Sequence, residues 1–382
     1  MMRRSVPLLC LWAASVSSCN ISASDPKYKD YVADVTKHVP GWEIVNLDLP
    51  PEERWGEIVA PKAKAIQEMI EAFKASNGKL VDMLMTTLEH AFGGIFSYFV
   101  NHLPEEYAKE IQGIEKATGI SAVDLFVYNI MYEFSGACTS LVAQDADGHI
   151  VHGRNLDFTP AEKLQPLLTN VRFMKGDKVL FNSTAYAGYI GCLTCMKGSF
   201  SITVDTRPWS TLPGKLKIPG GLAKWLTGID RSGHFLTFLT RDAFQQDSTY
   251  DQAVQRVNSS KILGPAYVII GGSKSGEGSI ITRDAEHSLH YWSLADQPAT
   301  APFILETNYD HWDGKPHDRR DNGNACMAEM AKQGRLGFEG IFQVLSSRPT
   351  CNPETTYTTL MSAREGRLES YFQYCREKHI WV

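Results

Sequence analysis

The sequence predicts an α+β protein in which a helical first part precedes a body rich in β-strands. Between residues 57 and about 134, apolar residues recur at helical spacing. After Cys138, short β-branched and aromatic runs separated by turns dominate, with helical patterns between some of them. A helical segment followed by a mixed body indicates an α+β fold.

Length and composition are those of a folded protein. The 382 residues, of which 43% are hydrophobic and 21% charged, suffice for one large domain or two small ones. The formal net charge is -5 and no long basic run occurs. This balance argues against nucleic acid as a partner.

Residues 1–18 have the pattern of a secretory signal peptide. Arg3 and Arg4 precede an apolar run over residues 6–16, and small residues follow. The run is too short to span a bilayer. The string "VSSC" also resembles a bacterial lipoprotein box with Cys19 as the lipidated residue, so this alternative stays open.

Residues 19–56 are expected to be extended, with a short strand over 44–49 between Pro and Gly residues. A first helix is predicted where apolar residues repeat at i, i+3, i+4 and i+7, which are Ile66, Met69, Ile70 and Phe73. Later helices are predicted over residues 105–116 and from Ser121, a favourable N-cap residue with Asp124 three positions on.

The stretch from Leu80 to Val100 is unusually apolar and aromatic, and Gly93-Gly94 interrupts it. One interpretation is a buried helical hairpin. The other is a surface that meets lipid, because large exposed apolar patches mark interaction sites.

The part after residue 134 begins with a predicted hairpin. Strands over residues 139–143 and 149–153 flank the turn Asp145–Gly148. Further strands are predicted at residues 170–174, 178–182, 200–205, 266–272, 279–284, 289–293 and 303–310. Helices are predicted at residues 221–226, 236–245, 250–257 and 326–332.

The cysteine count points to a free thiol. Seven of the eight cysteines remain after signal removal, so at least one is unpaired within an oxidised chain, and Cys138 is the candidate. Cys192-x-x-Cys195 could be half of a zinc site or a redox pair, but no second pair or nearby His pair completes a zinc site. We interpret these two cysteines as structural, and we expect no metal and no cofactor.

Three N-x-S/T triplets support the secretory route. Asn182 and Asn258 are candidate glycosylation sites, and Asn20 is a third if it survives processing.

Cys138 can act as a nucleophile only as a thiolate, and the pKa of a free thiol is about 8.5. A histidine from elsewhere in the chain could take its proton. Alternatively, cleavage before Cys138 would create an α-amino group, with a pKa of about 8, on the same residue. Arg154 could then stabilise the thiolate, and Asp157 could hold the amine, because a hairpin brings both back beside Cys138.

Strings along nearly the whole chain resemble the acid ceramidase and N-acylethanolamine acid amidase family, whose members are N-terminal nucleophile cysteine amidases. They are "VNLDLPPEERW", "CTSLVAQDADGHIVHGRNLDF", "AYAGYIG", "FLTRDAF", "ILGPAYVIIGGSKSGEG", "ETNYDHW", "DRR" and "YTTLMS". The resemblance implies an αββα sandwich preceded by a mainly helical α-chain. It places the α-subunit at residues 19–137 and the catalytic β-subunit at residues 138–382.

The resemblance also assigns roles to residues of this sequence. It makes Cys138 the nucleophile, freed by self-cleavage of the Ala137–Cys138 bond, with Arg154 and Asp157 beside it. Asn308 matches the residue that helps to form the oxyanion hole, and Arg319 matches an active-site arginine.

Two disulfides follow from the same resemblance. A Cys19–Cys326 bond would tether the two subunits. Cys351–Cys375 is the other expected pair, although the closely spaced C-terminal cysteine pair of the family is absent.

The sequence departs from the family at Thr206, which stands where these enzymes carry an acidic residue. Asp205 could substitute, although neighbouring strand residues point to opposite faces. The change either is tolerated or alters the rate of processing, and it is the only support for a catalytically silent lipid-binding protein. His149 and His152 are interpreted as structural, because a nucleophile with its own amine does not need them.

The family resemblance implies a fatty-acyl amide substrate cleaved through a thioester. Ceramide is the first expectation and an N-acylethanolamine the alternative. The signal peptide, the sequons and the resemblance together predict a lysosomal enzyme that works at a membrane surface as a peripheral protein. A lipid-presenting activator protein is a further expected partner.

Overall fold

The computed structural model describes residues 38–39, 41–76, 100–133, 136–208, 220–373 and 375. The predicted signal peptide, Cys19, Asn20 and the apolar stretch from Leu80 to residue 99 lie outside these residues.

The order of elements follows the predicted change from helices to strands. The first part holds β1 (Trp42–Asn46), α1 (Gly56–Val59), α2 (Ala63–Ser76), α5 (Glu105–Thr118) and α6 (Ala122–Ile130). The strands of the second part are β2 (Ala137–Gln144), β3 (Ile150–Asp157), β4 (Leu168–Lys175), β5 (Lys178–Tyr186), β6 (Thr194–Met196), β7 (Phe200–Thr206), β8 (Ala266–Gly272), β9 (Gly278–Arg283), β10 (Ser288–Ser293), β11 (Phe303–Glu306), β12 (Thr355–Ser362) and β13 (Arg367–Phe372). Its helices are α7 (Ala161–Leu164), α8 (Gly220–Leu226), α9 (Leu236–Gln246), α10 (Tyr250–Ser259), α11 (Asp318–Lys332) and α12 (Phe338–Ser346).

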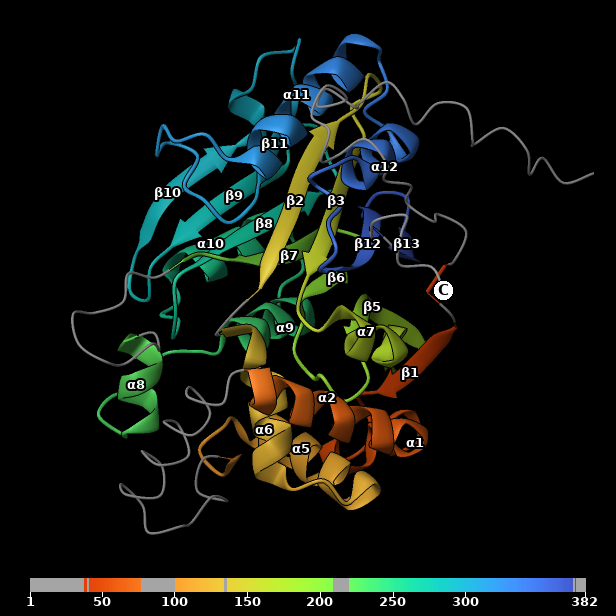
Figure 1. Cartoon of the computed structure of the whole chain (residues 1–382), viewed down its shortest axis with the longest axis vertical. Coiled ribbons are helices and arrows are strands. Elements are labelled where there is room, and N and C mark those ends of the chain that lie inside the picture. The colour runs from red at the N-terminus through yellow and green to blue at the C-terminus, as the bar shows by residue number, and fades with distance from the viewer. Residues whose placement is uncertain are drawn as a thin grey trace, which may run out of the picture.

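Two sheets pack face to face and form the middle of the molecule (Figure 1). The smaller sheet has the strand order β11-β2-β3-β12-β13, and the larger one has the order β1-β4-β5-β6-β7-β8-β9-β10. Strands β2 and β3 of the smaller sheet contact β7 and β8 of the larger one. Helices α11 and α12 pack on the smaller sheet, and α9 and α10 pack on the larger. The layers therefore follow the αββα order that the family resemblance implies.

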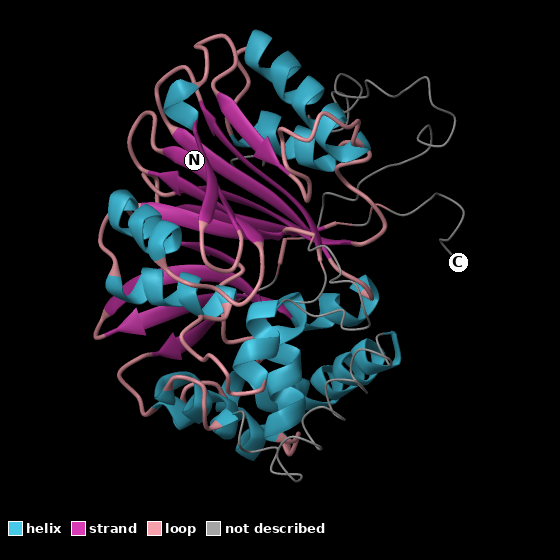
Figure 2. Ribbon diagram, turned by 90° about the vertical axis from the view of Figure 1, so that its left-hand side faces the viewer, coloured by secondary structure: helices cyan, strands magenta, loops and turns pink. Residues whose placement is uncertain are grey.

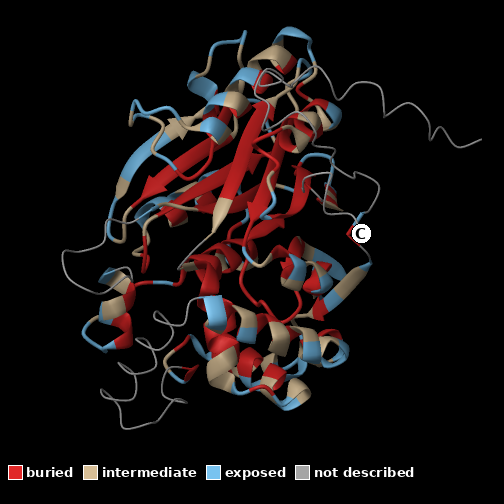
Figure 3. Ribbon diagram, in the orientation of Figure 1, coloured by how far each residue is buried: buried red, intermediate tan, exposed pale blue. Residues whose placement is uncertain are grey.

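The helical first part lies at one end of the molecule, below the sheets in Figures 1 and 2. Helices α2 and α5 bury one face and expose the other, whereas α6 is buried on all sides from Leu125 to Ile130 (Figure 3). In α2 the buried residues are the four that the periodicity identifies, Ile66, Met69, Ile70 and Phe73. None of the helices in the described ranges is both long and apolar enough to span a bilayer.

A buried charge network fastens this helical part to the body. The carboxylate of Glu110 in α5 accepts two hydrogen bonds of 2.6 Å from Arg241 in α9. It also accepts from Arg54 at 2.9 Å and from the indole N–H of Trp55 at 2.8 Å. Because all the acceptor sites face donors, the carboxylate can remain charged although it is fully buried.

Most predicted elements are confirmed, with shifted ends. The first strand covers residues 42–46 rather than 44–49, and Ser121 caps α6 by accepting a 3.2 Å hydrogen bond from the N–H of Asp124. Helix α11 begins eight residues before the predicted 326–332 segment. Its first turns are polar and lack an apolar stripe, so the hydrophobic pattern did not predict them. Helix α12 and strands β12 and β13 were not predicted.

The cysteines behave as expected wherever both partners are described. Cys192 pairs with Cys195, a disulfide that a structural pair and an oxidised redox pair would both show, and Cys351 pairs with Cys375. Cys138 is free and buried. Cys326 is disulfide-bonded, and its pairing with Cys19 stays a prediction.

The two described sequon asparagines differ in their surroundings. Asn258 is exposed near the end of α10. Asn182 is half-buried in the middle of β5, and its side-chain oxygen is buried without a hydrogen-bond partner. Asn258 is therefore the better placed of the two predicted glycosylation sites.

Candidate active site

The β2–β3 hairpin positions the predicted nucleophile and its neighbours. Ser140 is the register partner of Arg154, and Ala137 is the register partner of Asp157. Strand β2 lies between β11 and β3 in the smaller sheet and packs on β7 of the larger one. The pairing with β11 ends at Ser140, so Cys138 is paired in its sheet with Leu156 of β3, and its side chain is fully buried.

Two side chains contact the sulfur of Cys138. Nη2 of Arg154 donates to Sγ over 2.8 Å, and the hydroxyl oxygen of Tyr132 lies 2.9 Å from Sγ. Burial raises the pKa of the Cys138 thiol to about 12, although the positive charge of Arg154 acts in the opposite direction. In the uncleaved chain the thiol is therefore neutral.

The guanidinium of Arg154 is fixed by several acceptors. Its Nη1 donates to the carbonyl oxygen of Leu193 at 2.8 Å and to the hydroxyl of Thr194 at 3.0 Å. Its Nη2 lies 3.8 Å from the carboxylate of Asp205. These contacts orient the group so that Nη2 points at sulfur, as a thiolate-stabilising residue requires, while Nε has no hydrogen-bond partner among the described residues.

Asn308 and Arg319 hold the backbone of Cys138. The N–H of Cys138 donates to Oδ1 of Asn308 at 2.9 Å, and its carbonyl oxygen accepts from Nη1 of Arg319 at 2.5 Å. Nη2 of Arg319 also donates to Oδ1 of Asn308 at 2.7 Å. Because two donors face Oδ1, the orientation of the amide is determined, and its Nδ2 group donates to the carbonyl oxygen of Thr206.

Asp157 lies beside the cleavage site and does not contact the nitrogen of Cys138 in the uncleaved chain, so its predicted contact with the amine of the cleaved chain stays a prediction. Its carboxylate accepts from Thr355 at 2.6 Å and from Asn352 at 2.8 Å, and lies 3.4 Å from Arg319. Burial raises its pKa, and the charge of Arg319 opposes this. In the uncleaved chain the N–H of Cys138 is an amide with one hydrogen, and Asn308 accepts that hydrogen.

Thr206 and Asp205, at the departure from the family, both face the site. The hydroxyl of Thr206 donates to the carbonyl oxygen of Gly136, two residues ahead of the nucleophile. Asp205 accepts from the hydroxyl of Ser140 at 2.7 Å, while its other oxygen has no partner in the described part of the chain. Burial raises the pKa of Asp205 to about 7, against the effect of Arg154. Strand alternation thus sends the two side chains to different parts of one site.

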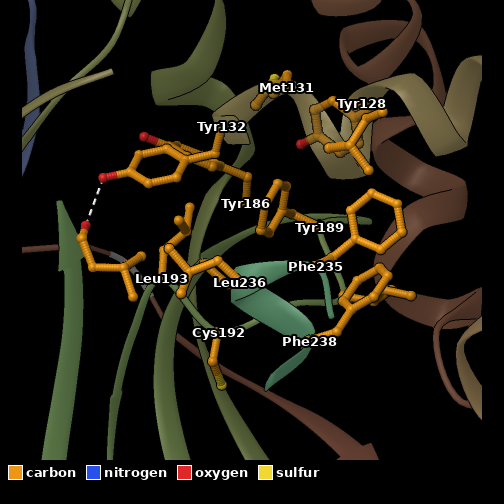
Figure 4. Close-up of a cluster of buried hydrophobic side chains, with 14 of the residues drawn as sticks. Tyr128, Met131, Tyr132, Tyr186, Tyr189, Cys192, Leu193, Phe235, Leu236 and Phe238 are labelled. Carbon is orange, nitrogen blue, oxygen red and sulfur yellow. Dashed lines mark hydrogen bonds between the residues drawn. The ribbon is translucent and has the colours of Figure 1, made fainter. Parts of the chain in front are cut away.

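A buried apolar cluster adjoins the nucleophile. Figure 4 shows Tyr132 on one side of it, near Leu193, with the rings of Tyr189, Phe235 and Phe238 further in. The cluster joins α6, the loop before β6 and helix α9, so it contains residues from both sides of the Ala137–Cys138 bond.

His152 is buried inside the fold as a structural residue. Its ring nitrogens pair with the hydroxyls of Ser201 and Thr203, and burial lowers its pKa to about 3. His149 is only half-buried and lies near Asp145.

Three residues of the site were not predicted from the sequence. They are Tyr132 and the two residues that donate to Asp157, Asn352 and Thr355. A tyrosine near a helix end carries no spacing signal of its own. Asn352 and Thr355 are about two hundred residues away from Asp157 in the chain.

Comparison with known proteins decides the family. The acid ceramidase of Homo sapiens is 33% identical over 403 residues, which cover 99% of each chain. The acid ceramidase of Mus musculus is 32% identical over 391 residues, 97% of this chain and 93% of the relative. The chain belongs to the acid ceramidase and N-acylethanolamine acid amidase family.

Two family models and a solved structure agree with this assignment. The model for linear amide C–N hydrolases of the choloylglycine hydrolase family matches residues 138–323, and the model for the beta subunit of N-acylethanolamine-hydrolyzing acid amidase matches residues 38–99. A Caenorhabditis elegans ortholog of that amidase superposes with a TM-score of 0.51 at 28% identity, covering 59% of this chain and 93% of its own. The protein is an amide hydrolase with an N-terminal nucleophile hydrolase fold.

Proposed function

We propose that the protein hydrolyses the amide bond of ceramide, releasing sphingosine and a fatty acid, after it has cut its own chain before Cys138. The contact of Arg154 with Sγ of Cys138 carries this proposal, because it places a fixed cation on the one free thiol of the described residues. The match to linear amide hydrolases begins at that same residue. The relatives named acid ceramidase, which align over nearly the whole chain, favour ceramide as substrate.

Self-cleavage begins with the thiol of Cys138 attacking the carbonyl carbon of Ala137. The sulfur–carbon bond forms, the carbon–nitrogen bond breaks, and the thiol proton ends on the nitrogen of Cys138. Water then hydrolyses the thioester to the carboxylate of Ala137 and restores the thiol. Asn308 and Arg319 support these steps by holding the nitrogen and the carbonyl oxygen of Cys138 in place.

The mature enzyme repeats this chemistry on the lipid amide. The new amino group of Cys138 takes the thiol proton and Arg154 stabilises the thiolate, which attacks the acyl carbon. The amine leaves with a proton, and water releases the fatty acid from the thioester. Asn308 is the proposed oxyanion donor, and its Nδ2 group must turn from Thr206 towards the substrate to serve this role.

The site of action is proposed to be the lysosomal membrane surface. The signal pattern, the exposed sequon at Asn258 and the family support this location. Ceramide lies in bilayers, so a lipid-contacting surface is needed, and the apolar stretch from Leu80 to Val100 is its candidate. An activator protein that presents lipid is a further proposed partner.

The cleavage proposal is tested with Cys138→Ala. Wild-type protein should show two fragments on a reducing gel, with the second one starting at Cys138, whereas the variant should stay whole and inactive. Normal cleavage or activity of the variant would refute the nucleophile assignment. If the wild-type protein itself stays whole and is inactive, the result would favour the alternative of a catalytically silent lipid-binding protein.

The substrate proposal is tested by comparing N-acylsphingosine with N-acylethanolamine of the same acyl chain, each in identical mixed micelles. We expect a higher kcat/KM on N-acylsphingosine. The reverse preference would favour the N-acylethanolamine amidase alternative. The similarity to the Caenorhabditis elegans protein supports that alternative.

A further inference from the structure

Tyr132 contacts the nucleophile from the other side of the cleavage site. It lies in the short 3-10 helix Met131–Glu133, six residues ahead of Cys138, and is fully buried. Its hydroxyl oxygen is 2.9 Å from Sγ of Cys138 and 2.5 Å from the carbonyl oxygen of Val204 in β7. Figure 4 shows the ring at one side of the apolar cluster, with its hydroxyl hydrogen-bonded to another of the residues drawn.

The chemistry of these groups fixes where the hydrogens lie. A carbonyl oxygen only accepts and a guanidinium only donates. Tyr132 therefore donates its hydrogen to Val204, and its oxygen is free to accept the S–H of Cys138. Because Arg154 already donates to Sγ, the thiol hydrogen points towards Tyr132.

We propose that Tyr132 is a further catalytic residue of self-cleavage. Its hydroxyl accepts a hydrogen bond from the thiol of Cys138 and, as the thiol proton moves to the nitrogen of Cys138, rotates to donate a hydrogen bond to the negatively charged sulfur. The inference rests on the proposed self-cleavage at Ala137–Cys138. It adds a second hydrogen bond to the sulfur at the moment when the sulfur is charged, beside the one from Arg154.

Tyr132 does not act as the base in this step. Burial raises its pKa well above that of free tyrosine, so the phenol stays neutral. Its contribution is a hydrogen bond to the charged sulfur in a buried site. Removing one bond of this kind lowers a rate by roughly ten- to one-hundredfold.

The test compares Tyr132→Phe with Tyr128→Phe in the full-length precursor. Tyr128 is an equally buried tyrosine whose hydroxyl donates to the carbonyl oxygen of Ala187 at 3.1 Å, so this variant loses one buried hydroxyl that does not contact the thiol. The rate of appearance of the two fragments is measured on gels, with and without hydroxylamine, which cleaves thioesters. Rates are taken well below the melting temperatures of both variants, so that unfolding does not contribute.

We expect Tyr132→Phe to cleave roughly ten- to one-hundredfold more slowly than Tyr128→Phe, by the same factor with and without hydroxylamine. Equal rates of the two variants would overturn the inference. Recovery of the normal rate by hydroxylamine would also overturn it, because the thioester would then form normally without the hydroxyl. Both outcomes leave the proposed function standing, because that function is tested separately by Cys138→Ala and by the comparison of the two substrates.

Discussion

Asp205 should make the uncleaved protein less stable as the pH rises from acid to neutral. Its carboxyl group is fully buried, and burial raises its pKa from 3.8 to about 7. The folded state therefore binds the proton more tightly than the unfolded state. The stabilisation is complete below about pH 4 and is lost as the pH rises through about 7.

The pKa difference sets the magnitude. At about 1.4 kcal/mol per pKa unit, the step from 3.8 to about 7 corresponds to about 4 kcal/mol. At pH 4.5 the carboxyl of the unfolded chain is already largely ionised. Between pH 4.5 and 7.5 the unfolding free energy should therefore fall by about 3 kcal/mol of the total of about 4 kcal/mol. Asp205→Asn keeps an oxygen for the hydroxyl of Ser140 and resembles the protonated form. It should remove this share of the pH dependence.

The assay is guanidinium unfolding of the Cys138→Ala precursor, which stays one chain, at both pH values with and without Asp205→Asn. Glu306 is also buried and Glu133 is half-buried, and burial raises the pKa of each, but both residues are present in every variant. Asp284→Asn is the matched control, because the pKa of Asp284 is lowered by hydrogen bonds that outweigh its slight burial. An equal fall in unfolding free energy with and without Asp205→Asn would refute the reasoning.

Two further predictions concern the link between the helical part and the body, and the cleavage site. Glu110→Gln should cost about 3–5 kcal/mol in unfolding free energy, because it removes the carboxylate that pairs at 2.6 Å with the buried guanidinium of Arg241 and leaves the partly exposed Glu106, 3.8 Å away, as its neighbouring charge. Glu105→Gln on the exposed face should change the unfolding free energy little. Thr206→Val should slow self-cleavage about fivefold, measured on timed gels, because it removes the hydroxyl that donates to the carbonyl oxygen of Gly136. An unchanged rate would show that this hydrogen bond does not position the scissile peptide.

The sequence predicted the site best where the residues are near one another in the chain. Cys138, Arg154 and Asp157 sit on one hairpin, and a turn with Asp and Gly between two strands fixes such a hairpin locally. Periodicity identified the buried face of α2 for the same reason. The existence of these elements therefore followed from short-range patterns.

The rest depends on contacts between distant segments. The family resemblance pointed to Asn308 and Arg319, but it did not show that they hold the backbone of Cys138 on both sides. Nor did it show that Asp157 is bound by Asn352 and Thr355 while the chain is uncut. The predicted helix at residues 326–332 is shorter than α11, because the polar first turns of α11 lack an apolar face. These turns depend on packing against β11, which a local sequence pattern does not show.

The contacts of Cys138 divide according to the fragment that supplies them, and this division bears on how the mature site arises. Arg154, Asn308 and Arg319 all follow the cleavage site, whereas Tyr132 precedes it. After the cut, the groups that hold the sulfur, nitrogen and carbonyl oxygen of Cys138 remain on the same chain as Cys138 itself. We therefore expect cleavage to change the chemical nature of that nitrogen, from amide to amine, with little change in its position. Among the contacts of Cys138 with described residues, the one from Tyr132 then spans two chains, so we expect it to be the one that substrate binding can displace without disturbing the nucleophile.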